Sequence, residues 1–204
     1  MHAIQADLSD VALARVVWRA ENAVITANSK LPPSAIFNVR ARNYSEAQAV
    51  AVRRQSDTNS RTASLAGVMN AIKTKPAILS RESYVSHLEG ELLLEVGHCD
   101  FNSWACADGS HIEPAMVERD LAFLLNATAE IKTYVDKFIA HHDRNRNGVT
   151  VPTFSELDKA IEVLFDLFKK YYLILTATAL ASVEPVPQYD LLGPYRIPWI
   201  DPTR

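Results

Sequence analysis

The sequence predicts an all-α fold, a helical bundle organised around a long antiparallel helix hairpin. Three observations predict it. In several segments apolar residues recur at steps of three and four, which places them on one face of a helix. Prolines and polar runs separate these segments, as is usual between helices. No segment alternates apolar and polar residues with the period of two that is typical of half-buried strands.

Length and composition indicate one globular core. The chain has 204 residues, of which 48% are hydrophobic and 22% are charged, so it needs no second domain to bury a core. We expect a single domain over residues 1–204, with an N-terminal helix and proline-containing link at 1–44, a bundle core at 45–182 and an extended, proline-rich tail at 183–204. Tyr189, Tyr195 and Trp199 are expected to dock this tail on the bundle.

Charge and cysteine content exclude several classes of protein. A formal net charge of −3 gives no protein-wide basic field, so any contact with RNA or a nucleotide must use a local patch. Two cysteines are too few for a disulfide scaffold. The first residues lack a signal-peptide pattern, and the longest apolar run, 171–181, is about half as long as a membrane span. We therefore expect a cytoplasmic protein with no membrane partner.

Four helices are expected in the first half of the chain. They cover residues of about 4–28, 45–54, 64–73 and 82–96. Pro32 and Pro33 follow the first helix, because proline cannot continue the helical hydrogen bonds, and Ser45 is expected to cap the second. The expected apolar side of the fourth helix consists of Tyr84, Val85, Leu88 and Leu92. Residues 97–110 are expected to form an irregular link.

Two long helices are expected in the second half. Pro114 suits a first helical turn and should open a helix of about 26 residues, longer than average. Its apolar seam is Val117, Leu121, Leu124, Thr128, Ile131, Val135, Phe138 and His142. The last helix begins with a capping box of Thr153 and Glu156, and its seam is Leu157, Ile161, Leu164, Phe168, Tyr171 and Leu175. Matching seams and a short link predict an antiparallel pair.

Two adjacent histidines close the first of these long helices. On a helical wheel His142 lies in the apolar seam, whereas His141 lies about 100° away, beside Lys137 one turn back. One interpretation makes them a packed residue and a helix-end cation. The other makes His141 a general acid or base, with Lys137 and either Arg144 or Arg146 holding a phosphate.

Two segments imitate metal sites. Residues 143–148 begin like a calcium loop, but the twelfth position is Phe154 where a bidentate glutamate is required, so a tight turn is the better interpretation. Four further metal-ligand types fall close together, namely His98, Cys99, Cys106 and His111. Their cysteines lack the close pairing typical of structural zinc sites. We expect no metal and no cofactor.

Four short stretches carry a family resemblance. They are DKFIAH at 136–141, RRQSD at 53–57, SLAGVMNAI at 64–72 and PYRIPW at 194–199. Together they resemble the HEPN superfamily, and more narrowly the AbiU-type abortive-infection proteins, over residues 45–200 or so. The resemblance implies a bundle with a long helix hairpin, often paired as a homodimer, in a phage-defence or toxin-type effector that can have an antitoxin partner.

The resemblance also implies a catalytic motif. Active HEPN proteins are metal-independent RNases with an Arg-x4-6-His motif, and His141 matches its histidine. The three positions allowed for the arginine are occupied by Tyr134, Val135 and Asp136. Lys137, four residues before His142, imitates the motif with a lysine, which lacks the bidentate fork of arginine. Alternatively an arginine replaces it in space, with Arg53, Arg54 and Arg144 as candidates.

Two functions therefore stay open. The first is an RNA-cleaving effector with His141, His142 and Lys137 as catalytic residues, and with a phosphate held by Arg53, Arg54, Arg144 and Arg146. The second is a non-catalytic helical module that dimerises or binds a nucleotide or RNA.

Overall fold

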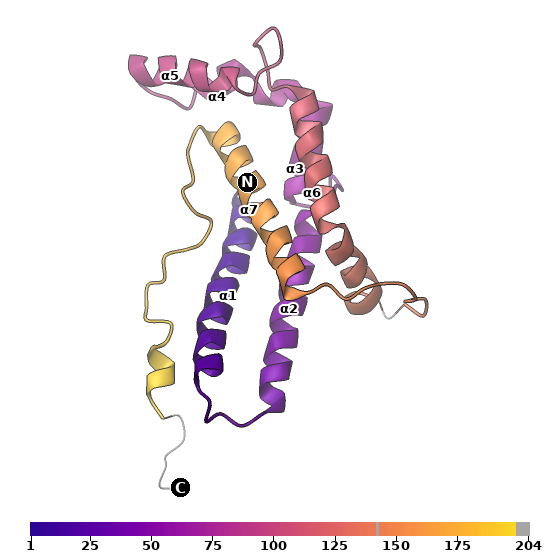
Figure 1. The fold of residues 1–204 in the computed structure, drawn as a ribbon. Helices are drawn as coiled ribbons and strands as arrows, with labels where there is room; N and C mark the ends of the chain where they lie inside the picture. The colour runs from indigo at the N-terminus through magenta and orange to yellow at the C-terminus, as the bar shows by residue number, and fades with distance from the viewer. Residues whose placement is uncertain (142, 199–204) are drawn as a thin grey trace.

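The structure is a computed structural model that describes residues 1–141 and 143–198. It confirms the all-α bundle (Figure 1). The α-helices are α1 His2–Ala27, α2 Ala35–Gln55, α3 Leu65–Thr74, α4 Arg81–Val85, α5 Glu91–Asn102, α6 Pro114–Tyr134 and α7 Phe154–Thr176. Shorter helical segments are η1 Pro76–Leu79, the π-helix η2 Val135–Ile139 and the 3-10 turn η3 Gly193–Arg196. The described residues contain isolated β-bridges but no named strand.

The predicted hairpin is formed by α6 and α7, which run antiparallel and pack against each other (Figure 1). The predicted capping box at Thr153 is present. On both helices the predicted seam faces the core, and its buried members are Val117, Leu121, Leu124, Thr128, Ile131, Val135, Leu157, Ile161, Leu164, Phe168 and Tyr171. Helical spacing and side-chain burial therefore agree along the whole contact.

The start of α2 differs from its predicted position. It begins at Ala35, ten residues before the predicted start, and its N-cap is Ser34, whose Oγ accepts a hydrogen bond from the N–H of Ile36 at 3.3 Å. Ser45, the predicted cap, lies inside the helix and donates to the carbonyl of Arg42 at 3.0 Å. Residues 35–47 contain no buried side chain, so this part of α2 has no apolar face for periodicity to reveal.

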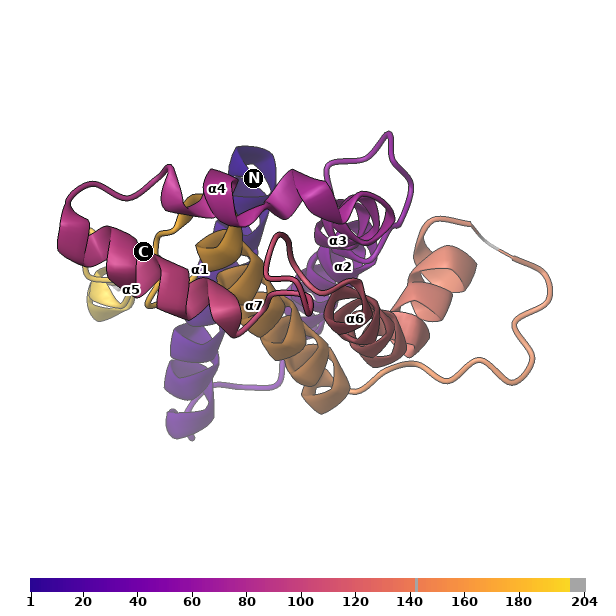
Figure 2. The same ribbon diagram turned by 90° about the horizontal axis from the view of Figure 1, so that it is seen from above.

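The segment predicted as a helix over 82–96 is divided. Gly90, with φ 92°, separates α4 from α5, because a left-handed residue interrupts the helix. Helix α5 then continues to Asn102, through part of the predicted irregular link. Leu92, predicted to face the core, is 72% exposed. Figure 2 shows α4 and α5 crossing over one end of the bundle.

Two of the remaining helices pack directly on α6. Helices α2 and α3 both pack on it, and α1 packs on α2. Beyond α7 the chain contains only η3 among the named elements of the described residues. Tyr195 in η3 donates a hydrogen bond to Glu21 and accepts one from Arg40 at 3.3 Å, which joins the tail to α1 and α2. Trp199 lies outside the described residues. In the part of the chain described, no helix has the length and apolar content needed to cross a membrane.

Candidate functional site

The C-terminal end of α6 changes its helical geometry before the candidate histidines. Val135–Ile139 forms a single turn of π-helix, in which the N–H of Ala140 reaches the carbonyl of Val135 at 2.8 Å. Such turns are rare overall, but those that occur often lie at functional sites. The helix ends here, so His141 follows it in non-helical backbone and the predicted helical-wheel position does not apply to it. His142 lies outside the described residues.

An open depression of about 470 Å³ lies at this helix end. It is lined by Arg53, Asp136, Lys137, His141 and Asp143. His141 is exposed. Three of the predicted site residues, Arg53, Lys137 and His141, therefore share one surface, together with two carboxylates that the sequence did not single out.

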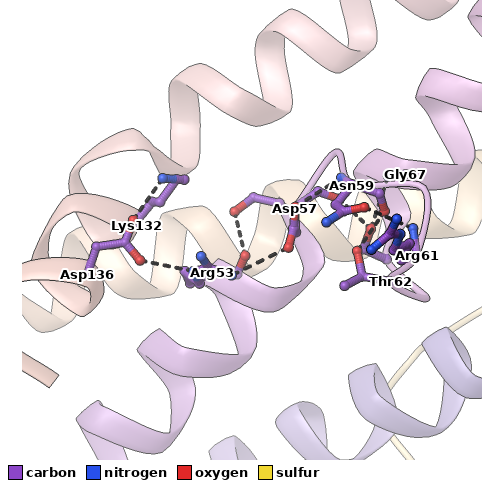
Figure 3. Close-up of polar contacts among 10 residues, drawn as sticks. Arg53, Asp57, Asn59, Arg61, Thr62, Gly67, Lys132 and Asp136 are labelled. Carbon is purple, nitrogen blue, oxygen red and sulfur yellow. Dashed lines mark hydrogen bonds and ion pairs between the residues drawn. The ribbon is translucent and has the colours of Figure 1, made fainter. Parts of the chain in front are cut away.

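Arg53 reaches this surface from the last turn of α2 and is held between two carboxylates (Figure 3). Its Nε donates to Asp136 at 3.1 Å, and its Nη1 lies 3.5 Å from Asp57, four residues on and just past the end of α2. Asp136 also accepts from Lys132 at 2.8 Å. Burial acts to raise the pKa of Asp136, but the hydrogen bonds from Lys132 and Arg53 outweigh it and leave that pKa below its ordinary value.

Lys137 is fixed in a second ion pair. It donates to Asp143, in the loop between η2 and α7. This hydrogen bond, with a further one from the N–H of Asn145 at 2.9 Å, lowers the pKa of Asp143. Both ion pairs are only partly buried, so each contributes little to folding stability. They set the positions of the two cations.

The other predicted arginines lie elsewhere. Arg54 donates to Asp7 of α1 at 3.0 Å and does not line the depression. Arg146 donates to the carbonyl of Asp143 at 2.8 Å, with its guanidinium 4.9 Å from the centre of the Phe138 ring. Arg144 is exposed and is also absent from the lining residues. The predicted phosphate-binding set is thus divided, and Arg53 alone among these arginines lies in the depression.

The first segment that imitates a metal site holds a turn, whereas the second is divided between α5, which carries His98 and Cys99, and the loop that follows it. In the loop after α6 the N–H of Asn145 bonds Asp143, Gly148 has φ 77°, and Phe154 is the first residue of α7. Cys99 is exposed, while Cys106 donates to Asp108 at 2.8 Å. Within residues 1–141 and 143–198 no group of three or more His, Cys, Asp or Glu side chains is placed to hold a metal ion.

Comparison with known families agrees with this architecture. The sequence profile of the HEPN family AbiU2 matches residues 8–193, which is nearly the whole chain. The chain belongs to the AbiU2 family of HEPN proteins. No curated protein and no solved structure matches it significantly.

Sequence reasoning missed the two aspartates of the site. Asp136 carried a usable signal, since it lies four residues after Lys132 on the same helix, the spacing of a helical ion pair. Asp143 was noticed only as the start of a calcium-like loop. The approach of Arg53 depends on how α2 packs beside η2, which no local pattern reveals.

Proposed function

We propose that this AbiU2-family protein is an abortive-infection effector that cleaves RNA without a metal ion. One observation carries the proposal. Arg53 comes from α2 into the same depression as Lys137 and His141, and so supplies the arginine that the residues just before His141 lack. Active sites are recognised by the spatial arrangement of groups and not by their order in the chain.

The proposed reaction uses these groups as follows. His141, as general base, takes the proton of a ribose 2′-hydroxyl as that oxygen attacks the neighbouring phosphorus. Arg53 and Lys137 stabilise the negative charge that builds on the phosphate oxygens, Arg53 with a fork of two N–H donors and Lys137 as a point charge. The 5′ oxygen leaves and takes a proton from water or from a second histidine. His142 is the predicted second histidine.

The aspartates set a condition on substrate binding. Lys137 is paired with Asp143, and Arg53 with Asp136 and Asp57. A phosphate must therefore share or displace these partners, which reduces the affinity of the free site for anions. Since the pairs are partly exposed, the exchange costs little and the cations stay oriented towards the depression.

A second function rests on the same ion pairs. If the carboxylates keep both cations neutralised, the depression cannot hold a phosphate, and the protein is a non-catalytic helical module that dimerises or binds a nucleotide or RNA. In either case we propose a cytoplasmic homodimer formed by a single-domain chain, with an antitoxin as a further partner. Light scattering of the purified protein tests the homodimer, and a monomer at all concentrations would contradict it.

The catalytic proposal is tested by incubating the protein with RNA in the presence of a chelator. We expect cleavage, and we expect His141→Ala to reduce its rate about 10²- to 10⁴-fold, the usual contribution of a general acid or base. His98→Ala, which changes an exposed histidine of α5, is the matched control and should cleave at the normal rate. A double change of His141→Ala and His142→Ala that still cleaves would exclude the assigned site.

A matched pair of variants tests the role of Arg53. Arg53→Ala should remove most of the activity, whereas Arg54→Ala, one residue along the same helix end, should retain it because Arg54 faces Asp7. Equal losses in both variants would mean that Arg53 has no special role. Absence of cleavage by the unmodified protein would favour the non-catalytic module.

A further inference from the structure

Three aromatic rings from three helices lie parallel where α1, α2 and the start of α7 meet. Trp18 of α1 stacks on Tyr44 of α2 with ring centres 4.7 Å apart and planes 9° from parallel. Phe154, the first residue of α7, is parallel to both, at 5.8 Å from Trp18 and 6.2 Å from Tyr44. Burial raises the pKa of Tyr44 to about 12, so its ring stays a neutral phenol at physiological pH.

These rings form one wall of a cavity of about 580 Å³ between α1, α2 and the start of α7. This volume is within the range of sites for small organic ligands. Ile25, Phe37 and Ala41 add apolar surface, while the amides of Asn22 and Asn38 add groups that both donate and accept hydrogen bonds. The cavity thus combines the faces of aromatic rings with amides, a combination that suits a planar heteroaromatic ring.

Little of the chain packs on the parts of α1 and α2 around the cavity, although Tyr195 of the tail contacts both helices there. Between Arg15 in α1 and Gln48 in α2 no residue is buried. Figure 1 shows the two helices extending past the start of α7. Folding therefore leaves these aromatic side chains with part of their surface in water, and a ligand ring stacked on them would remove that surface from solvent.

The arginines near the cavity are already paired. Arg19 lies 3.4 Å from Asp158, and Arg40 is paired with Glu21 and bonded to Tyr195. Binding in this cavity would therefore depend on stacking and on the amides, with little contribution from phosphate charge.

Aromatic side chains connect the two sites. Phe154 and Leu157 also line a second cavity, of about 140 Å³, whose other wall includes Tyr134 at the end of α6. Tyr134 stacks on Phe138 at 5.5 Å, and Phe138 belongs to the π-turn that precedes His141. Aromatic faces spaced along a surface in this way are how proteins hold successive bases of a single strand.

We propose that the cavity between Trp18, Tyr44 and Phe154 binds an unpaired nucleobase of RNA, whose strand continues along Tyr134 and Phe138 to the His141 depression. Naming RNA as the source of the base rests on the proposed function. The pocket itself rests on the ring geometry and its lining. Asn22 and Asn38 would contact the edge of the base, as amides do with adenine.

The test uses the His141→Ala protein, which should bind RNA without cleaving it, and follows tryptophan fluorescence during titration with a short unstructured oligoribonucleotide. Binding should quench Trp18. Ala41→Phe fills the cavity without removing any contact, and we expect it to weaken binding about 10- to 100-fold, the equivalent of about one stacked base. Ala47→Phe, on an exposed face of the same helix, is the matched control and should bind normally.

The outcomes distinguish a single nucleotide from an RNA strand, and RNA from a second copy of the chain, as the occupant of the cavity. A mononucleotide that binds at least tenfold more weakly than the oligonucleotide supports the strand, whereas equal binding supports the base pocket and removes the aromatic path. Normal RNA binding by Ala41→Phe would overturn the proposal. A Trp18 signal that changes with protein concentration alone would also overturn it, since a second copy of the chain would then fill the cavity.

Failure here is distinct from failure of the proposed cleavage. Cleavage that persists unchanged in Ala41→Phe, with His141 in place, leaves the catalytic proposal standing without the pocket. RNA that binds and quenches Trp18 without ever being cleaved leaves the pocket standing without catalysis.

Discussion

The N-terminal half of α6 and its C-terminal end use similar residue types in different ways. In the N-terminal half, Asp120 accepts hydrogen bonds from Tyr171 at 2.9 Å and from Lys170 at 2.6 Å, both on α7. Tyr171 is completely buried. This burial is the largest cause that raises the pKa of its hydroxyl, and the negative charge of the nearby Asp120 is the next. This polar network borders the apolar contact of the two helices and holds it in register. The side chains of Asp120 and Lys170 are themselves 20% and 31% exposed, so only Tyr171 is buried in this network.

At the end of α6 both partners of every ion pair are partly exposed. Asp136, Lys137 and Asp143 form ion pairs whose side chains keep about a third of their surface in water. The comparison shows that such groups stabilise the fold where one partner, here Tyr171, is buried, and that they position charges where every partner is partly exposed. It predicts that stability should depend on the part of the hairpin around Tyr171, and function on the end of α6.

The largest expected effect is on an apolar seam residue. Phe168→Ala removes a completely buried ring from α7, and we expect a loss of about 3–5 kcal/mol in the free energy of unfolding. Denaturant unfolding followed by circular dichroism measures it. Phe138→Ala, at the end of α6, is the matched variant and should lose much less, because its ring is half-buried. Equal losses would mean that the two regions do not differ in packing.

A smaller loss of folding stability is expected for the polar network of Asp120, Lys170 and Tyr171. Asp120→Ala leaves the buried Tyr171 hydroxyl without its acceptor and should cost about 1–3 kcal/mol. Asp166→Ala, which removes an exposed partner of Lys169 on α7, should change stability by less than about 0.5 kcal/mol. The same unfolding assay compares them, and a loss at Asp166 as large as that at Asp120 would contradict the role of burial.

The smallest effect is expected at the end of α6. Asp136→Asn should cost less than about 1 kcal/mol at neutral pH, because its pairs with Arg53 and Lys132 are partly exposed. The pKa of Asp136 is lowered in the folded protein, so its contribution is present above the ordinary value of about 4 and is lost as the pH falls through the lowered pKa. Unfolding curves of both proteins should therefore converge in acid. A difference that grows as the pH falls would contradict the assignment.

Much of the fold could be predicted because it depends on local sequence patterns. The steps of three and four along α6 and α7, and the capping box at Thr153, correspond directly to buried residues and a formed cap. Prediction failed where burial does not impose a period. The exposed first half of α2, predicted as part of a link, is helical, and the left-handed Gly90 divides the helix that apolar spacing predicts over 82–96.

The candidate site shows the same division. The family, the two long helices and the position of Lys137 and His141 where the first of them ends could be predicted from residues close together in the chain. Packing of distant segments places Arg53, and not Arg54 or Arg144, beside them, and brings Trp18, Tyr44 and Phe154 together across three helices. Neighbouring arginines on a helix point about 100° apart, so only the packing of α2 against α6 selects which of them reaches the site.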